Sequence, residues 1–180
     1  LEGEKTWVKY PRPQLRRDNY KIINEGWTID GKDIKVPFPP QSILSGYREE
    51  TKDEFSYKVN FDYVKEAGHR VLLHFDAVDQ IASVFINDTY IGKHEGGYLP
   101  FSFDVTDVIK EENRLEVQVI DKLDLDYPYG KQTKKRGGMW YTPVSGIWQS
   151  VWLESVPETY IRKLHIENRG ASVTITTEPA

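Results

Sequence analysis

Hydrophobic and polar residues alternate along most of this chain with a period of two. Residues 113–121 read NRLEVQVID, in which aliphatic residues alternate with glutamate and glutamine. The same alternation occurs in residues 55–63 (FSYKVNFDY) and 101–105 (FSFDV), and residues 69–75 (HRVLLHF) are also rich in strand-forming types. A period of two is typical of strands that bury one face. The pattern therefore predicts a chain built mainly of half-buried β-strands.

The segments between the predicted strands carry turn signals. Residues 81–91 read IASVFINDTYI, and the Asn87-Asp88-Thr89 step at their centre suits a tight hairpin, because Asn and Asp tolerate positive φ. The same three residues form a glycosylation sequon, which matters only in a protein that a eukaryote secretes. Residues 106–110 (TDVIK) fit one helical turn capped by Thr106. Since no long amphipathic helix is visible, we expect an all-β fold, a jelly-roll β-sandwich.

The end of the chain reads as a separate unit. Residues 159–166 and 171–177 each predict a strand, with a polar turn between them. A lone hairpin cannot bury a core and is marginal in water. We therefore expect residues 1–157 to form the sandwich domain and residues 158–180 to begin another. The chain also starts with Leu1 rather than methionine, so we expect it to be a piece of a longer polypeptide.

Composition narrows the function. The 180 residues include 38% hydrophobic and 13% aromatic side chains, enough for one core, and the net charge is −4. That balance gives no basic face for nucleic acid, and the short cluster Lys134-Lys135-Arg136 reads as a solvated loop. No window approaches the roughly 20 apolar residues of a membrane span. Without cysteine there is no disulfide or thiolate chemistry, which fits both a reducing compartment and many exported proteins.

Few residues are spaced for metal or cofactor chemistry. The four histidines are scattered, and His69 and His74, five apart, fall on opposite faces of one predicted strand. Asp121, Asp124 and Asp126 form a DxxDxD pattern, which suits either a calcium ion or a solvated acidic loop. Its spacing does not match the EF-hand loop. We therefore expect no metal and no cofactor.

The densest aromatic stretch is residues 137–154, GGMWYTPVSGIWQSVWLE, which holds three of the five tryptophans. In this stretch Trp148 and Trp152 fall on the face opposite the aliphatic residues. Bare indoles in pairs are costly to leave in water. Either they pack in the core or against another domain, or they stack on a ligand.

This aromatic stretch resembles the one that closes the N-terminal domain of glycoside hydrolase family 2, the β-galactosidase and β-glucuronidase family. Other pieces resemble the family in the same order, namely residues 10–27 (YPRPQLRRDNYKIINEGW), 36–46 (VPFPPQSILSG) and 71–103, which contain a Gly-Gly-Tyr-x-Pro-Phe run. Two departures are Asp88, where the family hairpin often has glycine, and Tyr20, where the opening often has tryptophan.

The resemblance implies a galactose-binding-like jelly roll, called the sugar-binding domain of the family. It is followed in the family by an immunoglobulin-like sandwich, whose first hairpin would be residues 158–180, and by a (β/α)₈ barrel. The catalytic glutamates lie on that barrel, and their motifs do not occur here. We therefore expect no catalytic residue and no hydrolysis by this chain alone, and we expect its partner to be the rest of its own polypeptide.

The resemblance also implies site residues. In some members this domain lends an aspartate to the substrate pocket, by position Asp121, whose carboxylate would accept hydrogen bonds from sugar hydroxyls. Trp148 and Trp152 are the other candidate sugar-binding residues. The alternative to a domain of a larger β-glycosidase is a free-standing carbohydrate-binding module with an aromatic platform. An interaction sandwich that binds no sugar is a third reading.

Overall fold

The computed structural model describes residues 17–47, 49–124, 126–135 and 137–180, and within these ranges the fold is all-β with no α-helix. Residues 10–16 of the family-like opening and Arg136 of the basic cluster lie outside them. The strands are β1 (Tyr20–Ile22), β2 (Thr28–Ile29), β3 (Lys32–Asp33), β4 (Glu54–Asp62), β5 (His69–Phe75), β6 (Val78–Asp79), β7 (Ile81–Ile86), β8 (Thr89–Glu95), β9 (Phe101–Asp104), β10 (Glu112–Ile120), β11 (Gly146–Ile147), β12 (Val151–Pro157), β13 (Ile161–Arg169) and β14 (Ser172–Pro179), with a 3₁₀ turn, η1 (Ile43–Ser45). Among the described residues, no helix is long and apolar enough to cross a membrane.

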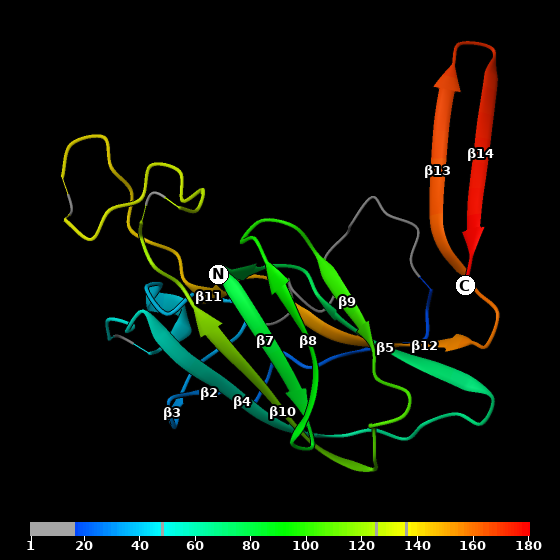
Figure 1. The fold of residues 1–180 in the computed structure, drawn as a ribbon, viewed down its shortest axis with the longest axis horizontal. Helices are drawn as coiled ribbons and strands as arrows, with labels where there is room; N and C mark the ends of the chain where they lie inside the picture. The colour runs from blue at the N-terminus through cyan, green and yellow to red at the C-terminus, as the bar shows by residue number, and fades with distance from the viewer. Residues whose placement is uncertain (1–16, 48, 125, 136) are drawn as a thin grey trace.

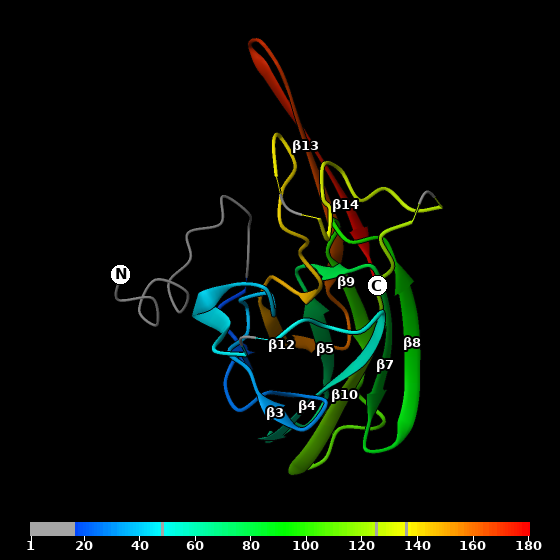
Figure 2. The ribbon, with the colours of Figure 1, turned by 90° about the vertical axis from the view of Figure 1, so that its left-hand side faces the viewer.

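Two antiparallel sheets make up the body of the molecule (Figures 1 and 2). One sheet has four strands in the order β1-β12-β5-β9, and the other has six in the order β3-β2-β4-β10-β7-β8. Neighbours in the sheets are often distant in sequence, as where β10 lies between β4 and β7. A separate two-stranded sheet is formed by the short strands β6 and β11. The predicted all-β sandwich is confirmed.

The core lies between the two sheets and follows the alternation in the sequence. On β10, Leu115, Val117 and Val119 are at most 1% exposed, while the residues between them face outward. On β4 the same alternation buries Tyr57 and its apolar neighbours. Each aliphatic side chain so buried contributes roughly 1.5–3 kcal/mol. The two-residue period therefore fixes which face of each strand meets the core.

The predicted hairpin around Asn87 is also confirmed. Asn87 and Asp88 have φ of 50° and 66°, the left-handed region that these residues tolerate. The Asn87 side-chain amide donates to the Val108 carbonyl (2.9 Å) and to Asn113 Oδ1 (3.0 Å). Both N–H groups of the amide are thereby used. A glycan on this nitrogen would replace one of the two hydrogens and so remove one of these bonds.

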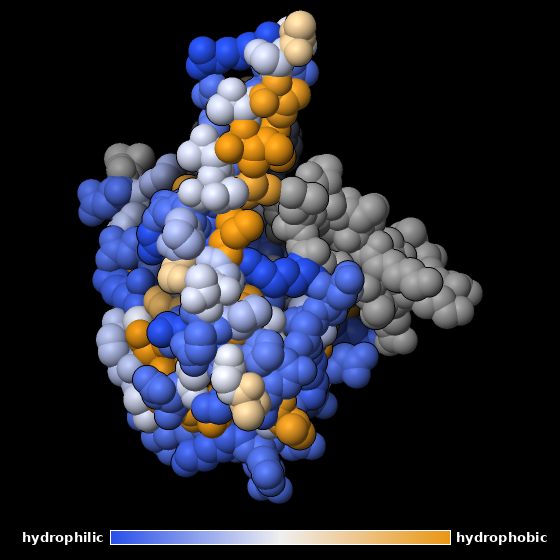
Figure 3. Space-filling view, turned by 90° about the vertical axis from the view of Figure 1, so that its right-hand side faces the viewer, coloured by the Kyte–Doolittle hydropathy of each residue, from blue (hydrophilic) through white to orange (hydrophobic). Residues whose placement is uncertain are grey.

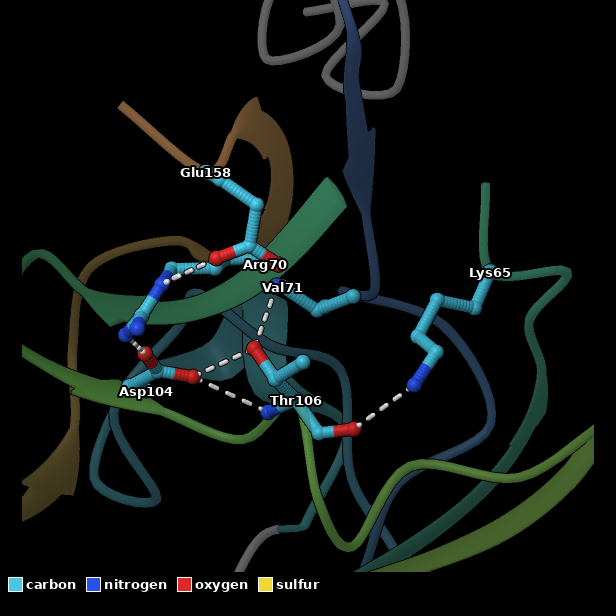
Figure 4. A network of polar contacts seen from close by, with 6 residues as sticks. All are labelled: Lys65, Arg70, Val71, Asp104, Thr106 and Glu158. Atoms are coloured by element: carbon cyan, nitrogen blue, oxygen red, sulfur yellow. Dashed lines mark hydrogen bonds and ion pairs between the residues drawn. The ribbon is translucent and has the colours of Figure 1, made fainter. Parts of the chain in front are cut away.

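Residues 105–109 form a single turn closed by the Val108 and Ile109 amides, which donate to the Val105 carbonyl (3.1 and 3.0 Å). The predicted single turn is therefore present, but Thr106 is not its cap (Figure 4). The cap is Asp104, whose carboxylate accepts from the Thr106 amide (3.0 Å), while the Thr106 hydroxyl accepts from the Val71 amide (2.9 Å). Arg70 joins this network through Asp104 (2.7 Å) and Glu158 (3.3 Å). The threonine hydroxyl is committed to the neighbouring strand, which leaves the aspartate to cap the turn.

The last two strands pair only with each other, as the hairpin β13–β14 that extends from the sandwich (Figure 1). The two strands predicted for this segment are therefore confirmed. One face of the hairpin is apolar, and Figure 3 shows it as a stripe along the hairpin. Its residues are exposed, with Val173 at 60% and Ile175 at 62%. Arg17 links the hairpin to the sandwich by donating to the Ile161 carbonyl (2.7 Å).

Candidate functional site

A buried carboxylate lies at one end of the sandwich, where β6 pairs with β11. Asp79 ends β6, lies opposite Gly146 and is 5% exposed. The backbone at Gly97 closes over it, since a Cβ on Gly97 would lie 2.0 Å from Asp79 Oδ1. Any side chain at position 97 would clash with Asp79, so this position requires glycine. The clash explains the second glycine of the Gly-Gly-Tyr run.

A second carboxylate, Asp121, lies at the same end. It follows β10 directly, and its amide donates to the Asp53 carbonyl (2.9 Å). The Ser145 hydroxyl hydrogen-bonds its side chain. Ser145 is in turn held by Gln41, which donates to the hydroxyl (2.9 Å) and accepts from the Ser145 amide (3.1 Å). The Pro-rich segment that contains Gln41 thus supports the group that contacts Asp121.

The two carboxyl groups influence each other electrostatically. Burial, and next the charge of Asp121, raise the pKa of Asp79 to about 7, although a hydrogen bond from Gln132 works in the other direction. Burial also raises the pKa of Asp121, against the lowering effects of Ser145 and Lys134. Neither carboxylate has an ion-pair partner among the described residues. The pair is therefore a set of partly desolvated acceptors, of which Asp121 feels the charge of Lys134 without a direct ion pair.

Gln132 connects this pair to the long loop after β10. Its side-chain oxygen accepts from the Val144 amide (2.5 Å), and its nitrogen donates to the Tyr129 carbonyl (2.8 Å). A bridge between Gln132 and Tyr141 joins the loop to the segment that leads into β11. Tyr129 and Val144, which precede and follow Gln132 in the chain, are thus linked through Gln132 to Asp79.

The tryptophans of the aromatic stretch are not brought together. Trp148 lies at the carboxylate end, where its indole N–H donates to the Gly97 carbonyl (2.8 Å) and its ring meets Tyr98 edge-on. Trp152 lies on the outer face of the four-stranded sheet, stacked on His74 at 3.9 Å with its N–H on Asp76 (3.1 Å). Both are half-buried. The arrangement does not favour a shared flat platform of the kind a free-standing module needs.

A buried glutamate near Trp152 was not singled out from the sequence. Glu154 is 4% exposed and accepts from Arg17 (2.9 Å) and His74 (3.1 Å). Although burial raises it, His74 and Arg17 hold the pKa of Glu154 below its usual value. The charge is neutralised within the sheet, so we regard Glu154 as a structural residue that anchors Arg17.

The carboxylate end of the molecule carries an exposed apolar rim. Its side chains come from the loop before β9 and from the segment before β11, and each is more than half exposed: Tyr98, Leu99, Met139, Trp140 and Tyr141. Gly97, next to Tyr98, and Gln132, which pairs with Tyr141, both contact Asp79, so the two groups of exposed side chains flank the carboxylate end from different loops.

No metal centre accompanies these acids. Within the part of the chain that the structure describes, no three His, Cys, Asp or Glu side chains gather so that they could hold an ion. Of the DxxDxD pattern, Asp124 uses its carboxylate to accept from the Asp126 amide (3.1 Å), as in a simple turn. The calcium reading of this loop has no support from its geometry.

Sequence reasoning missed Asp79, although it found Asp121. Asp79 stands in the run AVDQIASV, and an aspartate inside an apolar run is a usable signal, because an acid buried with its neighbours needs a reason. The period of two suggested only another strand there. What the sequence did not reveal is that β6 and β10 end at the same place.

The sandwich of two antiparallel sheets has the architecture of a galactose-binding-like domain. The chain belongs to the family described as "Glycosyl hydrolase 2 galactose-binding domain-like", which it matches over residues 34–167. This confirms the resemblance to glycoside hydrolase family 2.

The β-galactosidase and β-glucuronidase relatives that the chain matches are much longer than the chain. The chain is 32% identical over 143 residues to a β-galactosidase of Thermoanaerobacter pseudethanolicus, covering 75% of the chain and 17% of that protein. It is 46% identical over 118 residues to a β-glucuronidase of Bacteroides fragilis, covering 58% of the chain and 17% of that protein. The chain thus spans less than a fifth of either relative.

Solved structures share the fold. A β-glucuronidase of an uncultured Clostridium superposes with a TM-score of 0.73 at 24% identity, over 92% of this chain and 35% of that one. A Lactobacillus rhamnosus β-glucuronidase gives a TM-score of 0.68 at 27% identity, over 92% and 34%. The superposed part of each is about a third of its chain, so the chain corresponds to part of a larger polypeptide.

Proposed function

We propose that this chain is the non-catalytic N-terminal domain of a larger family 2 β-glycosidase. The enzyme would hydrolyse O-glycosidic bonds with catalytic residues located elsewhere in its polypeptide. Support comes from the small share of the named β-galactosidase and β-glucuronidase relatives that the chain covers. A retaining glycosidase needs two carboxyl groups about 5–5.5 Å apart across an open cleft, and the Asp79 carboxyl is enclosed by Gly97.

The observation that carries this proposal is the pair Asp79 and Asp121 at the end of the sandwich. Both are desolvated, lack an ion-pair partner among the described residues and lie beside an exposed apolar rim. Carboxylate oxygens accept hydrogen bonds from sugar hydroxyls. We infer that this end forms one edge of the sugar pocket, with Asp121 as its more accessible acceptor and Asp79 as its support.

The two tryptophans would take different parts. Trp148 borders Asp79 through the Gly97 carbonyl, so it would shape the pocket edge or contact the sugar. Trp152, at the start of β12 and stacked on His74, would pack against a neighbouring domain. The free-standing module needs an open platform, which this arrangement does not favour.

The domain boundary follows from the hairpin. An isolated two-stranded hairpin with an exposed apolar face is marginal in water, and the β13–β14 hairpin has such a face. We propose that residues 1–157 form the sandwich domain and that residues 158–180 begin an immunoglobulin-like domain. Further strands of that domain would cover the apolar face, and the catalytic barrel would meet the rim at the other end.

The test uses the full-length enzyme and this chain in parallel. We expect Asp121→Ala to leave the fold intact and to lower kcat/KM of the full enzyme about 10-fold, the effect of one lost hydrogen bond to a charged group. Asp126→Ala, in the same loop and exposed, is the matched control. The chain alone should give no turnover of p-nitrophenyl β-galactoside or β-glucuronide.

Three results would count against this assignment. Turnover by the chain alone contradicts the non-catalytic role. An Asp121→Ala enzyme with wild-type kinetics removes Asp121 from the pocket. Loss of the folded state in the isolated Asp121→Ala chain, seen by circular dichroism, makes Asp121 a structural residue.

A further inference from the structure

The loop after β10 lines an open surface cavity beside the carboxylate pair. Its volume is about 510 Å³, and its walls include Asp53, Lys122, Asp124, Tyr129, Lys134 and Lys135. Three lysines gather here although the chain as a whole carries a net charge of −4. Two of them belong to the basic cluster that the sequence alone assigned to a solvated loop. Lys134 and Lys135 therefore both belong to the wall of this cavity.

The charges on the cavity wall are only partly neutralised. Lys134 is paired with Asp53 at 2.9 Å, and this pair holds the pKa of Asp53 below its usual value. The Asp124 carboxylate is occupied by the Asp126 amide. Lys122 and Lys135 have no ion pair within the described part of the chain. Two ammonium groups are thus available to a ligand against one acid that already serves its own turn.

The cavity adjoins the carboxylate pair, although neither Asp79 nor Asp121 lines it. Lys122 follows Asp121 in sequence, and the Asp121 amide is bound to the backbone of Asp53, which lines the cavity. Gln132 also lines the cavity while its side chain hydrogen-bonds Asp79. A glycan held at Asp121 would therefore have its neighbouring substituent over the lysines.

We propose that this cavity binds an acidic group, a uronate carboxylate or a sulfate ester, carried by the glycan on which the parent enzyme acts. The inference rests on the proposed function, since it places the acidic group next to a sugar held at Asp121. Lysine ammonium groups pair with either anion as point charges, whereas Tyr129 offers an apolar ring face for the sugar that carries it. The substrate class is then an acidic glycan rather than a neutral one.

The experiment titrates this chain, labelled with ¹⁵N, with three disaccharides of one backbone: neutral, carrying a uronate, and carrying a sulfate ester. We expect an acidic disaccharide to shift the amide signals of residues 122–135 and the neutral one to shift them less. In the double variant Lys122→Gln/Lys135→Gln the affinity for the acidic disaccharide should fall about threefold to tenfold. Sodium chloride at about 0.5 M should weaken it similarly. Lys110→Gln, a lysine outside the cavity lining, is the matched control.

The two acidic arms distinguish the source of the anion, since the preferred group is the one that binds more tightly. Equal binding of neutral and acidic disaccharides overturns the proposal, as does no binding of either acidic one. A double variant that behaves like Lys110→Gln also overturns it. Asp121→Asn separates the two ideas. If it leaves all binding unchanged while the lysines matter, the cavity stands and Asp121 leaves the site; the reverse result removes the cavity alone.

Discussion

A buried acid with no cation beside it is the most informative residue of this chain. Burial and the neighbouring Asp121 place the pKa of Asp79 at about 7, well above the value of 3.8 for an ordinary aspartate. Between these two pH values the folded chain binds more protons than the unfolded chain. The free energy of unfolding therefore falls as the pH rises from about 4 to about 7, and is flat with respect to this group above that.

Asp79→Asn should remove this dependence. The free energy of unfolding of the variant minus that of the wild type should be larger at pH 8 than at pH 5. The increase should be on the order of 1–3 kcal/mol, because the amide carries no charge to desolvate. Urea denaturation at both pH values measures the difference. The control is Asp104→Asn. Burial raises the pKa of Asp104, but hydrogen bonds from Thr106 and Arg70 outweigh this and hold the pKa below its usual value. The stabilisation that ionised Asp104 gives the folded chain is therefore lost as the pH falls. A parallel pH response of the two variants would contradict the assignment.

At the scale of the strands, the sequence was most informative where one rule decides the structure. The alternation of residues 113–121 predicts β10 because every second side chain must enter the core. The single turn at 106–110 was predicted, but its cap was not, because the Thr106 hydroxyl accepts from the Val71 amide and Asp104 caps the turn instead. That amide belongs to a strand 35 residues away in sequence.

The candidate site was harder to predict for the same reason. Asp121 was found only through a family resemblance, and its contact with Ser145 depends on Gln41, 104 residues from Ser145 in the chain. Asp79 was missed because a local alternation of apolar and polar residues predicts a strand but not which other strand ends beside it. Trp148 and Trp152 look equivalent in the sequence, yet Trp148 follows the end of β11 and Trp152 lies within β12, so they reach different surfaces.

The β7–β8 hairpin allows a test of the turn residues. Asp88→Gly should stabilise the chain by about 0.5–1 kcal/mol, since glycine adopts a φ of 66° without the cost that a Cβ adds. The loss of an exposed ion pair with Arg114 offsets little of this gain. Asn87→Ala should destabilise by about 1–3 kcal/mol, because the Val108 carbonyl and Asn113 lose their donor. Thermal unfolding of both variants measures the contrast; destabilisation by Asp88→Gly of the same size would refute it.

For the whole molecule, two contact surfaces lie apart on one body (Figures 1 and 2). The loop end carries the carboxylates, the lysine-lined cavity and the apolar rim, whereas the hairpin extends from another part of the sandwich. A domain with a surface for a sugar pocket and a separate surface for the next domain would position substrate without catalysing. This division requires that the sandwich keep its fold when the hairpin is absent.

Removal of residues 158–180 tests that requirement. The hairpin strands pair only with each other. The described links of residues 158–180 to the sandwich include the Arg17 bond to Ile161, the Arg17 guanidinium over the Tyr160 ring (5.3 Å) and the exposed Arg70–Glu158 pair. Exposed pairs contribute about 0–1 kcal/mol each, so the shortened chain should lose at most about 1–2 kcal/mol of its free energy of unfolding. Its urea transition should stay a single cooperative step, and in the intact chain the amides of β13 and β14 should exchange faster than those of β10. A shortened chain that fails to fold would mean that the hairpin completes the sandwich, and that the boundary at residue 157 is misplaced.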